Sequence, residues 1–67
     1  MKGLSTSDIE LINQLKIKPT TKREIAKMFH KKVNDSLLIR LETNGVLVYE
    51  EEDKQKVVRY GVLKCVN

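Results

Sequence analysis

Residues 20–29 read TTKREIAKMF and carry the clearest helix signal in the chain. Thr21, followed three residues later by Glu24, is a capping box in which the two side chains satisfy backbone N–H groups at a helix start. Apolar residues then recur at helical spacing on one face: Ile25, Ala26, Met28 and Phe29. The stretch predicts a helix opened by Thr20 and Thr21, with Met28 and Phe29 in the core.

A turn and a further helix are predicted next. Residues 30–32 (HKK) break the apolar periodicity and are interpreted as the turn. Apolar residues then recur four apart, at Val33, Leu37 and Leu41. Asn34 is a good N-cap, with Lys32 as the alternative start. Asn44-Gly45 fits the end of this helix, because glycine adopts left-handed backbone geometry without steric cost.

A first helix is predicted from Ser7 to about Leu15, because Ser7 and Glu10 also form a capping box. Its apolar stripe comprises Ile9, Ile12 and Leu15, with Leu11 off the stripe. Residues 16–19 (KIKP) alternate polar and apolar, and proline cannot continue a helix. This piece is therefore expected to be a short extended bridge or a minor edge strand.

Beyond Gly45 the pattern changes to that of β-strands. Residues 46–49 (VLVY) and 57–63 (VVRYGVL) are rich in β-branched and aromatic residues, and the polar residues 50–56 (EEEDKQK) separate them. A β-hairpin follows, in which Tyr49 and Tyr60 are expected to face each other across the strands. The predicted fold class is a small α+β domain, with three helices followed by a two-stranded hairpin.

Length and composition limit the class of protein. A chain of 67 residues has room for one domain, residues 1–67 with a core of about 5–63, and 40% apolar residues give it a thin core. It has neither an apolar run of ~20 residues for a membrane span nor a secretory signal at its start. One cysteine, Cys65, excludes an internal disulfide framework. We expect an intracellular, cytoplasmic protein in a reducing environment.

The same features argue against an enzyme. Little chain is left over to build a pocket, and the single histidine, His30, has no carboxylates clustered near it in the sequence. No catalytic residue, metal, cofactor or small-molecule ligand is expected. The class that remains is a binding module.

The order of elements, with TTKREIAKMF leading to LETNGVLV at residues 41–48, resembles a winged helix-turn-helix domain of the bacterial and archaeal transcriptional-regulator type. In that family a Thr-capped helix carrying Ile-Ala leads through a turn into the recognition helix. A Leu-Glu-x-x-Gly-hydrophobic run then opens the wing. The likeness covers residues 5–63, and it implies a small transcriptional regulator that binds double-stranded DNA.

Positive charge is concentrated before and within the turn that precedes the recognition helix. The net charge is +4, and residues 16–32 hold seven Lys and Arg residues against Glu24 alone. Clustered charge of this kind is the footprint of phosphate binding, whereas a merely solvated lysine face is the alternative. The predicted phosphate contacts are Thr21 (through the helix start), Lys22, Arg23, Lys31 and Lys32.

Base contacts are predicted from the recognition helix, at Asn34, Ser36 and Arg40, if these residues lie on its outer face. Arginine binds guanine and asparagine binds adenine in a bidentate manner. At the hairpin tip, Lys54, Gln55 and Lys56 are candidates for a minor-groove or phosphate contact, with a plain solvated turn as the alternative.

A homodimer is also expected, because the apolar tail at residues 61–67 extends past the hairpin as an unpaired edge strand. Two subunits would address DNA half-sites ~34 Å apart. The main alternative function is a winged-helix protein–protein interaction module, since the four carboxylates at residues 50–53 suit a basic protein. Binding of structured RNA is a third possibility.

Overall fold

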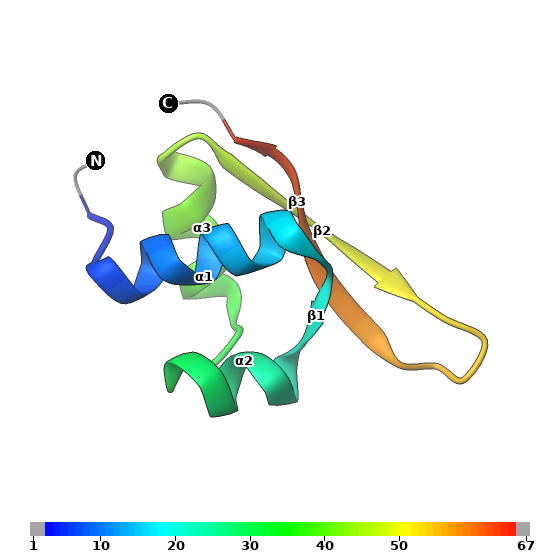
Figure 1. Ribbon diagram of the computed structural model, residues 1–67. Helices are drawn as coiled ribbons and strands as arrows, with labels where there is room; N and C mark the ends of the chain where they lie inside the picture. Colours follow the sequence, from blue (N-terminus) through cyan, green and yellow to red (C-terminus); the bar gives the residue numbers. More distant parts are fainter. Residues whose placement is uncertain (1–2, 66–67) are drawn as a thin grey trace.

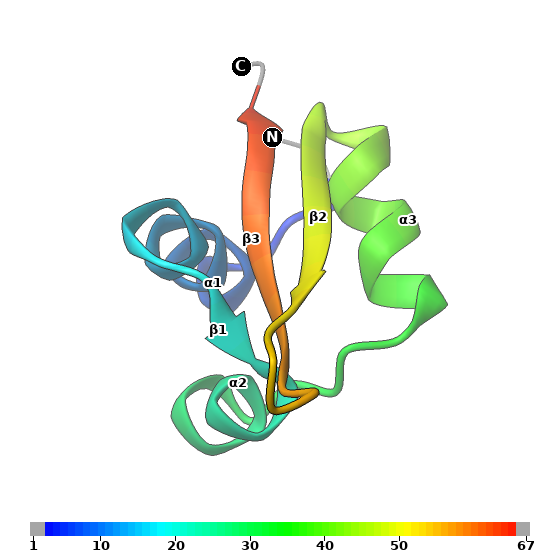
Figure 2. The ribbon, with the colours of Figure 1, turned by 90° about the vertical axis from the view of Figure 1, so that its right-hand side faces the viewer.

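The computed structural model describes residues 3–65, which form three α-helices and a three-stranded antiparallel sheet. In chain order the elements are α1 (Thr6–Ile17), β1 (Thr20–Thr21), α2 (Lys22–Phe29), α3 (Asp35–Thr43), β2 (Val46–Glu52) and β3 (Val58–Cys65). Helix α3 packs against β2, whereas α1 and α2 contact β3 and each other (Figures 1 and 2). The tip of the β2–β3 hairpin projects beyond the helices (Figure 1). The predicted α+β class is confirmed.

The sheet has a third strand besides the two predicted hairpin strands, and it lies just after residues 16–19, which were predicted to be an extended bridge or a minor edge strand. Strand β1 pairs with β3, so that Thr20 lies opposite Tyr60 and the strand order is β1-β3-β2. Thr20 is fully buried, and its hydroxyl donates to the Lys18 carbonyl oxygen at 3.1 Å. Thr20 therefore belongs to a strand and not to the start of α2. A strand of two residues is too short to show an alternating pattern in the sequence. Its extended geometry depends on pairing with Arg59 and Tyr60, which are distant in the chain.

Helix α1 begins earlier and ends later than predicted. Its N-cap is Ser5, whose hydroxyl accepts the Asp8 N–H at 3.2 Å while the Asp8 carboxylate accepts the Ser5 N–H at 3.0 Å. The predicted Ser7–Glu10 capping box was wrong, since the equivalent pair two residues upstream is the one that forms. The helix also includes Ile17, so the extended segment begins only after it.

The prediction of which residues form the buried stripe of α1 was also wrong. Leu11 is completely buried, whereas Ile9 is 40% exposed. The stripe runs through Asp8, Leu11, Ile12 and Leu15, which is a full helical repeat. Its first position is a carboxylate, and the apolar pattern alone placed Ile9 there.

Helix α2 has the predicted N-cap at Thr21, but only half of the predicted capping box forms, because the Glu24 carboxylate accepts the Thr21 hydroxyl at 3.1 Å and not the Thr21 N–H. The Thr21 hydroxyl accepts the Glu24 N–H at 3.1 Å, and Ile25 is buried. Phe29 is half-buried against the core, but Met28 is 50% exposed. The core prediction for Met28 was wrong because so short a helix presents only the Ile25–Phe29 side to its neighbours.

Helix α3 also has the predicted ends. The Asn34 side chain accepts the Leu37 N–H at 2.9 Å and is the N-cap, which settles the choice against Lys32. Gly45 follows the helix with a φ of +82°, in the left-handed region expected of it.

The hairpin register separates the two tyrosines. Tyr49 lies opposite Gly61, and Tyr60 lies opposite Glu50, so the predicted Tyr49–Tyr60 pair was wrong. The Tyr49 ring covers Gly61 so closely that a Cβ there would approach the ring to 2.6 Å. Tyr60 is instead buried among the helices. A shift of one residue in register exchanges the two faces of a strand, and the alternating pattern did not fix that shift.

The core draws on every element except β1. Within residues 3–65 its buried apolar side chains are Leu11, Ile12, Leu15, Ile25, Val33, Leu37, Leu41, Val46 and Tyr60. Gly61, Val62, Lys64 and Cys65 pair with β2, so this part of the apolar tail lies within the hairpin and not beyond it, whereas the described pairs with β1 involve only Arg59 and Tyr60. Val66 and Asn67 lie outside the described residues.

The hairpin turn contains a position that favours glycine. Asp53 accepts the Lys56 N–H at 2.9 Å through its carbonyl, and Lys56 then has a φ of +64°. This is a three-residue loop whose last residue lies in the left-handed region, where a side chain costs free energy.

Lys56→Gly should therefore raise the free energy of unfolding by about 0.5–1 kcal/mol, because relief of strain exceeds the entropy that glycine loses on folding. Urea denaturation followed by circular dichroism measures the change. Lys54→Gly is the matched control, which removes the same charge from the turn at a position without positive φ and should not stabilise. Equal midpoints for the two variants would contradict this account of the turn.

Candidate nucleic-acid interface

The first turn of α2 and the linker that follows α2 place basic side chains next to each other. Thr21 is the N-cap, so Lys22 and Arg23 occupy the first two helical positions and are exposed. The linker from His30 to Asn34 then passes the same helix and carries Lys31 and Lys32.

These residues line a hollow of about 530 Å³, which we call the α2 hollow. Its lining residues are Lys22, Arg23, Ala26, His30, Lys31, Lys32 and Val33. Within residues 3–65, the ion pairs involve none of Lys22, Arg23 and Lys32. Lys22 does lie over the Tyr60 ring, with Nζ 5.9 Å from the centroid. The hollow therefore carries positive charge that the neighbouring side chains leave uncompensated.

His30 gives the linker its direction. It is the C-cap of α2, with a φ of +54° and its N–H donating to the Ala26 carbonyl at 3.0 Å. This left-handed residue ends the helix where glycine would usually stand, which explains how the turn forms without one. Val33 then anchors the linker in the core.

A second hollow borders the same linker, and we call it the α3 hollow. It has a volume of about 210 Å³ and is lined by Lys31, Lys32, Asn34, Ser36, Leu37 and Arg40. Lys31 and Lys32 border both hollows, so the linker forms a basic ridge between α2 and the first turn of α3.

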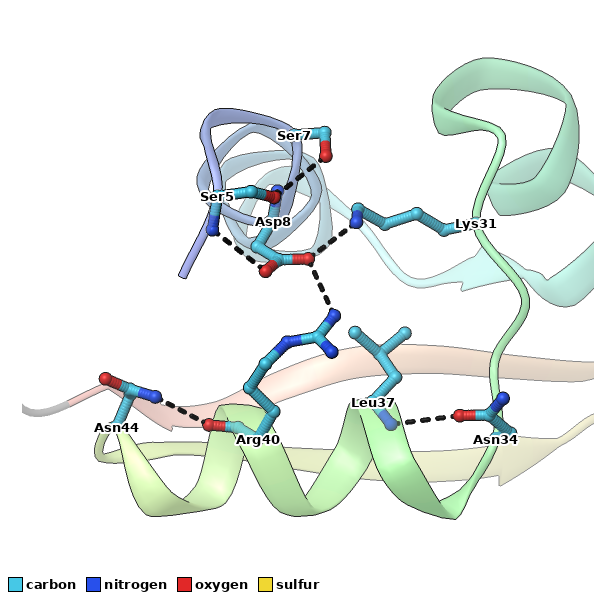
Figure 3. A network of polar contacts seen from close by, with 8 residues as sticks. All are labelled: Ser5, Ser7, Asp8, Lys31, Asn34, Leu37, Arg40 and Asn44. Carbon is cyan, nitrogen blue, oxygen red and sulfur yellow. Dashed lines mark hydrogen bonds and ion pairs between the residues drawn. The ribbon is translucent and has the colours of Figure 1, made fainter. Parts of the chain in front are cut away.

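Behind this ridge lies a buried carboxylate, that of Asp8 (Figure 3). Asp8 is only 2% exposed, and its Oδ1 lies 2.7 Å from Lys31 Nζ and 3.1 Å from Arg40 Nη2. Its Oδ2 accepts the Ser5 N–H of the capping box. One side chain thereby ties the start of α1 to the linker and to α3.

The surroundings of Asp8 favour its charged form. Burial by itself raises the pKa of a carboxyl group, but hydrogen bonds from Lys31, the Ser5 backbone and Arg40, together with the charge of Lys31, outweigh it. The pKa of Asp8 consequently lies well below its usual range.

The sequence-predicted contacts divide into three groups in space. Those lining the α2 hollow are Lys22, Arg23, Lys31 and Lys32, next to the Thr21 cap. Those lining the α3 hollow are Lys31, Lys32, Asn34, Ser36 and Arg40. Lys54, Gln55 and Lys56 are exposed at the hairpin tip and line neither hollow.

Two of the predicted contacts have an internal partner. Lys31 is only 17% exposed in its side chain and Arg40 37%, and both are paired with Asp8. Sequence reasoning missed Asp8, although the spacing of Ser5 and Asp8 is itself a capping-box signal.

Negative charge is gathered elsewhere. Strand β2 carries Glu50, Glu51 and Glu52, all exposed, and α3 exposes Asp35 and Glu42. The turn residue Asp53 differs from these, because its Oδ2 accepts a hydrogen bond from Arg59 at 2.7 Å. The described chain thus has a basic side, around α2 and the linker, and an acidic strand β2.

No family model, curated protein or solved structure matches this chain. Among the described residues, none of the helices has the length and apolar character to traverse a lipid bilayer. Over residues 3–65 there is also no cluster of three His, Cys, Asp or Glu side chains suited to a metal ion.

Asp8→Asn tests whether the buried carboxylate organises the site. Asparagine keeps the size and the Ser5 contact but loses the charge, so the free energy of unfolding at pH 7 should fall by about 1–3 kcal/mol. The loss is limited because Lys31 and Arg40 are partly exposed and can regain water.

The lowered pKa of Asp8 predicts that the free energy of unfolding falls as the pH falls. A carboxyl group whose pKa is lower in the folded chain stabilises it above the unfolded pKa of about 3.9 and loses that effect as the pH falls. Urea denaturation between pH 7 and pH 2 should show the wild-type chain approaching Asp8→Asn in acid. Asp53→Asn, which breaks the partly exposed pair with Arg59 near the tip, is the control and should cost less at pH 7. Curves for wild type and Asp8→Asn that stay parallel throughout would contradict the assignment.

Proposed function

We propose that this chain binds double-stranded DNA through the ridge between its two basic hollows. The observation that carries the proposal is the shared border of these hollows. Lys31 and Lys32 join the start of α2 to the start of α3, with Lys22, Arg23 and Lys32 free of internal ion pairs among residues 3–65. Uncompensated charge on one continuous surface favours a polyanion.

The order of elements supports DNA over other polyanions. Three helices followed by a hairpin agree with the winged helix-turn-helix resemblance, and α2, the linker and α3 would be its helix-turn-helix unit. In that geometry the helix before the recognition helix crosses the sugar–phosphate backbone, while the N-terminal residues of the recognition helix meet the bases. The exposed positions of Lys22 and Arg23 suit the first role.

Base reading would be limited to the first turn of α3. The side-chain oxygen of Asn34, Oδ1, accepts the Leu37 N–H in the cap. This leaves the side-chain N–H₂ group of Asn34 to donate to a base acceptor. Ser36 lies beside it in the α3 hollow. Exposed Asp35, within this first turn, and exposed Glu42, near the end of the helix, would repel a phosphate backbone brought close to α3. A small regulator with modest sequence preference is the function this arrangement fits.

The wing would contribute only its tip. Lys54 and Lys56 flank Gln55 there, in reach of a phosphate or a minor groove. The exposed carboxylates of Glu50, Glu51 and Glu52 keep the body of β2 away from the backbone.

Fluorescence anisotropy with a labelled 20-base-pair duplex tests the proposal. If about six phosphates are contacted, the association constant should fall ~10³-fold between 50 and 200 mM salt. An affinity that is absent at 50 mM salt, or that does not respond to salt, would refute duplex binding by this surface.

Lys32→Glu is the variant of choice, because Lys31→Glu would place a carboxylate against Asp8 and disturb the fold. Lys32 is exposed and has no ion-pair partner within residues 3–65, so its reversal should weaken duplex binding at least ~10-fold and lower the salt slope by about one. Lys64→Glu makes the same charge change at an exposed residue of β3 that lines neither hollow, and it should have a much smaller effect. Equal losses for the two variants would indicate attraction by net charge alone.

A second candidate function is an adaptor that binds a basic protein segment. It is favoured by the position of β2, an edge strand with β3 as its one strand neighbour among the described residues, which carries Glu50 to Glu52. An extended peptide can pair with such an edge, and lysines would match its charge.

The Glu50→Lys/Glu51→Lys double variant separates the two functions. For a DNA-binding protein it should bind the duplex at least as tightly as wild type. For an adaptor, wild type should bind a synthetic lysine-rich peptide and not the duplex, and the double variant should lose the peptide.

A further inference from the structure

Arg40 makes incomplete use of its hydrogen-bonding groups. Its Nη2 donates to Asp8 Oδ1 at 3.1 Å, while its Nε is buried and has no hydrogen-bond partner among residues 3–65. Nε and one terminal nitrogen of an arginine form a fork that fits two oxygens of one carboxylate or phosphate. Here only half of that fork is engaged.

The capping box explains why Asp8 cannot fill the other half. Its Oδ2 is turned toward α1 and accepts the Ser5 N–H at 3.0 Å, so only Oδ1 is offered to the cations. Oδ1 is itself shared, because Lys31 Nζ lies closer to it than Arg40 does, at 2.7 Å against 3.1 Å. Figure 3 shows the two cations converging on this one oxygen.

Departure of Arg40 would leave Asp8 still neutralised. Lys31 keeps the shorter ion pair and is the more buried of the two cations. Arg40 is the more exposed and borders the α3 hollow, together with Lys32 and Ser36. A phosphate group in this hollow would lie beside Lys32 and the Ser36 hydroxyl, and the Arg40 Nε, which is buried in this structure, would reach it once the side chain turns away from Asp8.

We propose that Arg40 exchanges the Asp8 carboxylate for a phosphate group bound in the α3 hollow, where its Nε and Nη2 form a bidentate contact alongside Lys32 and Ser36. This inference rests on the proposed function, because the phosphate is taken to be one of the DNA backbone. It gives Arg40 a phosphate contact in place of the guanine contact predicted from the sequence, and it makes Asp8 the internal competitor of the DNA.

Nuclear magnetic resonance of the Arg40 Nε–H group tests the exchange with inorganic phosphate as the probe. The signal should shift and saturate as phosphate is added, whereas sodium chloride at equal ionic strength should leave it in place. The Arg59 Nε–H signal is the internal control, since Arg59 is paired with Asp53 at the hairpin tip. An Arg40 signal that does not respond, or that responds equally to chloride, would overturn the proposal.

Arg40→Lys keeps the positive charge but removes the fork. Its affinity for inorganic phosphate, followed through the backbone amide signals of Ser36 and Lys32, should fall at least ~5-fold. Arg59→Lys is the matched control and should bind phosphate like wild type. Equal affinities in Arg40→Lys and wild type would overturn the bidentate contact, and if Arg40→Lys fails to fold, the Nε–H titration of wild type decides alone.

The 20-base-pair duplex separates this inference from the proposed function. Duplex binding that is equal in wild type and Arg40→Lys refutes the exchange and leaves the DNA-binding proposal intact. Saturable phosphate binding through Arg40 without any duplex binding refutes the DNA assignment and supports the phosphate site itself.

Discussion

The carboxylate of Asp8 is the interaction on which the arrangement of this small domain depends. It is buried at the start of α1, and its partners come from α1 itself, from the α2–α3 linker and from α3. A buried charge without partners is costly, so the three segments are held in the positions that satisfy it. The linker that carries Lys31 also forms the ridge between both hollows. The geometry of the candidate interface is thus determined by a contact that lies behind it.

This arrangement also explains which features could be predicted from the sequence. The caps at Thr21 and Asn34 and the left-handed Gly45 depend on residues within four positions, and local patterns identified all of them. Strand β1 and the hairpin register depend on partners far along the chain. The spacing of Ser5 and Asp8 is a local signal for the cap, but the burial of the Asp8 carboxylate depends on Lys31 and on Arg40, which is 32 residues away.

The candidate site shows the same limit at the level of single residues. The concentration of basic residues in 16–32 was visible because the charges are neighbours in sequence. Which of these cations form ion pairs within the domain could not be predicted from the sequence. Lys31 and Lys32 are adjacent and chemically identical, yet Lys31 points inward to Asp8 while Lys32 is exposed.

The separation of charge over the fold constrains how a duplex could approach. Attraction acts at α2 and the linker, whereas Glu50 to Glu52 repel along β2, and at physiological salt both effects act over only ~8 Å. On the β2 side of the hairpin, the repulsion ends where the charge changes sign. That point is the tip, because Arg59 neutralises Asp53 at 2.7 Å and leaves the charges of Lys54 and Lys56 uncompensated. The same ion pair restrains the turn that presents these lysines, since the other Asp53 carboxylate oxygen accepts the Gln55 and Val57 N–H groups. At the linker Asp8 pairs with Lys31, and at the tip Asp53 pairs with Arg59. In both places the aspartate determines which neighbouring cations remain without an ion pair among the described residues.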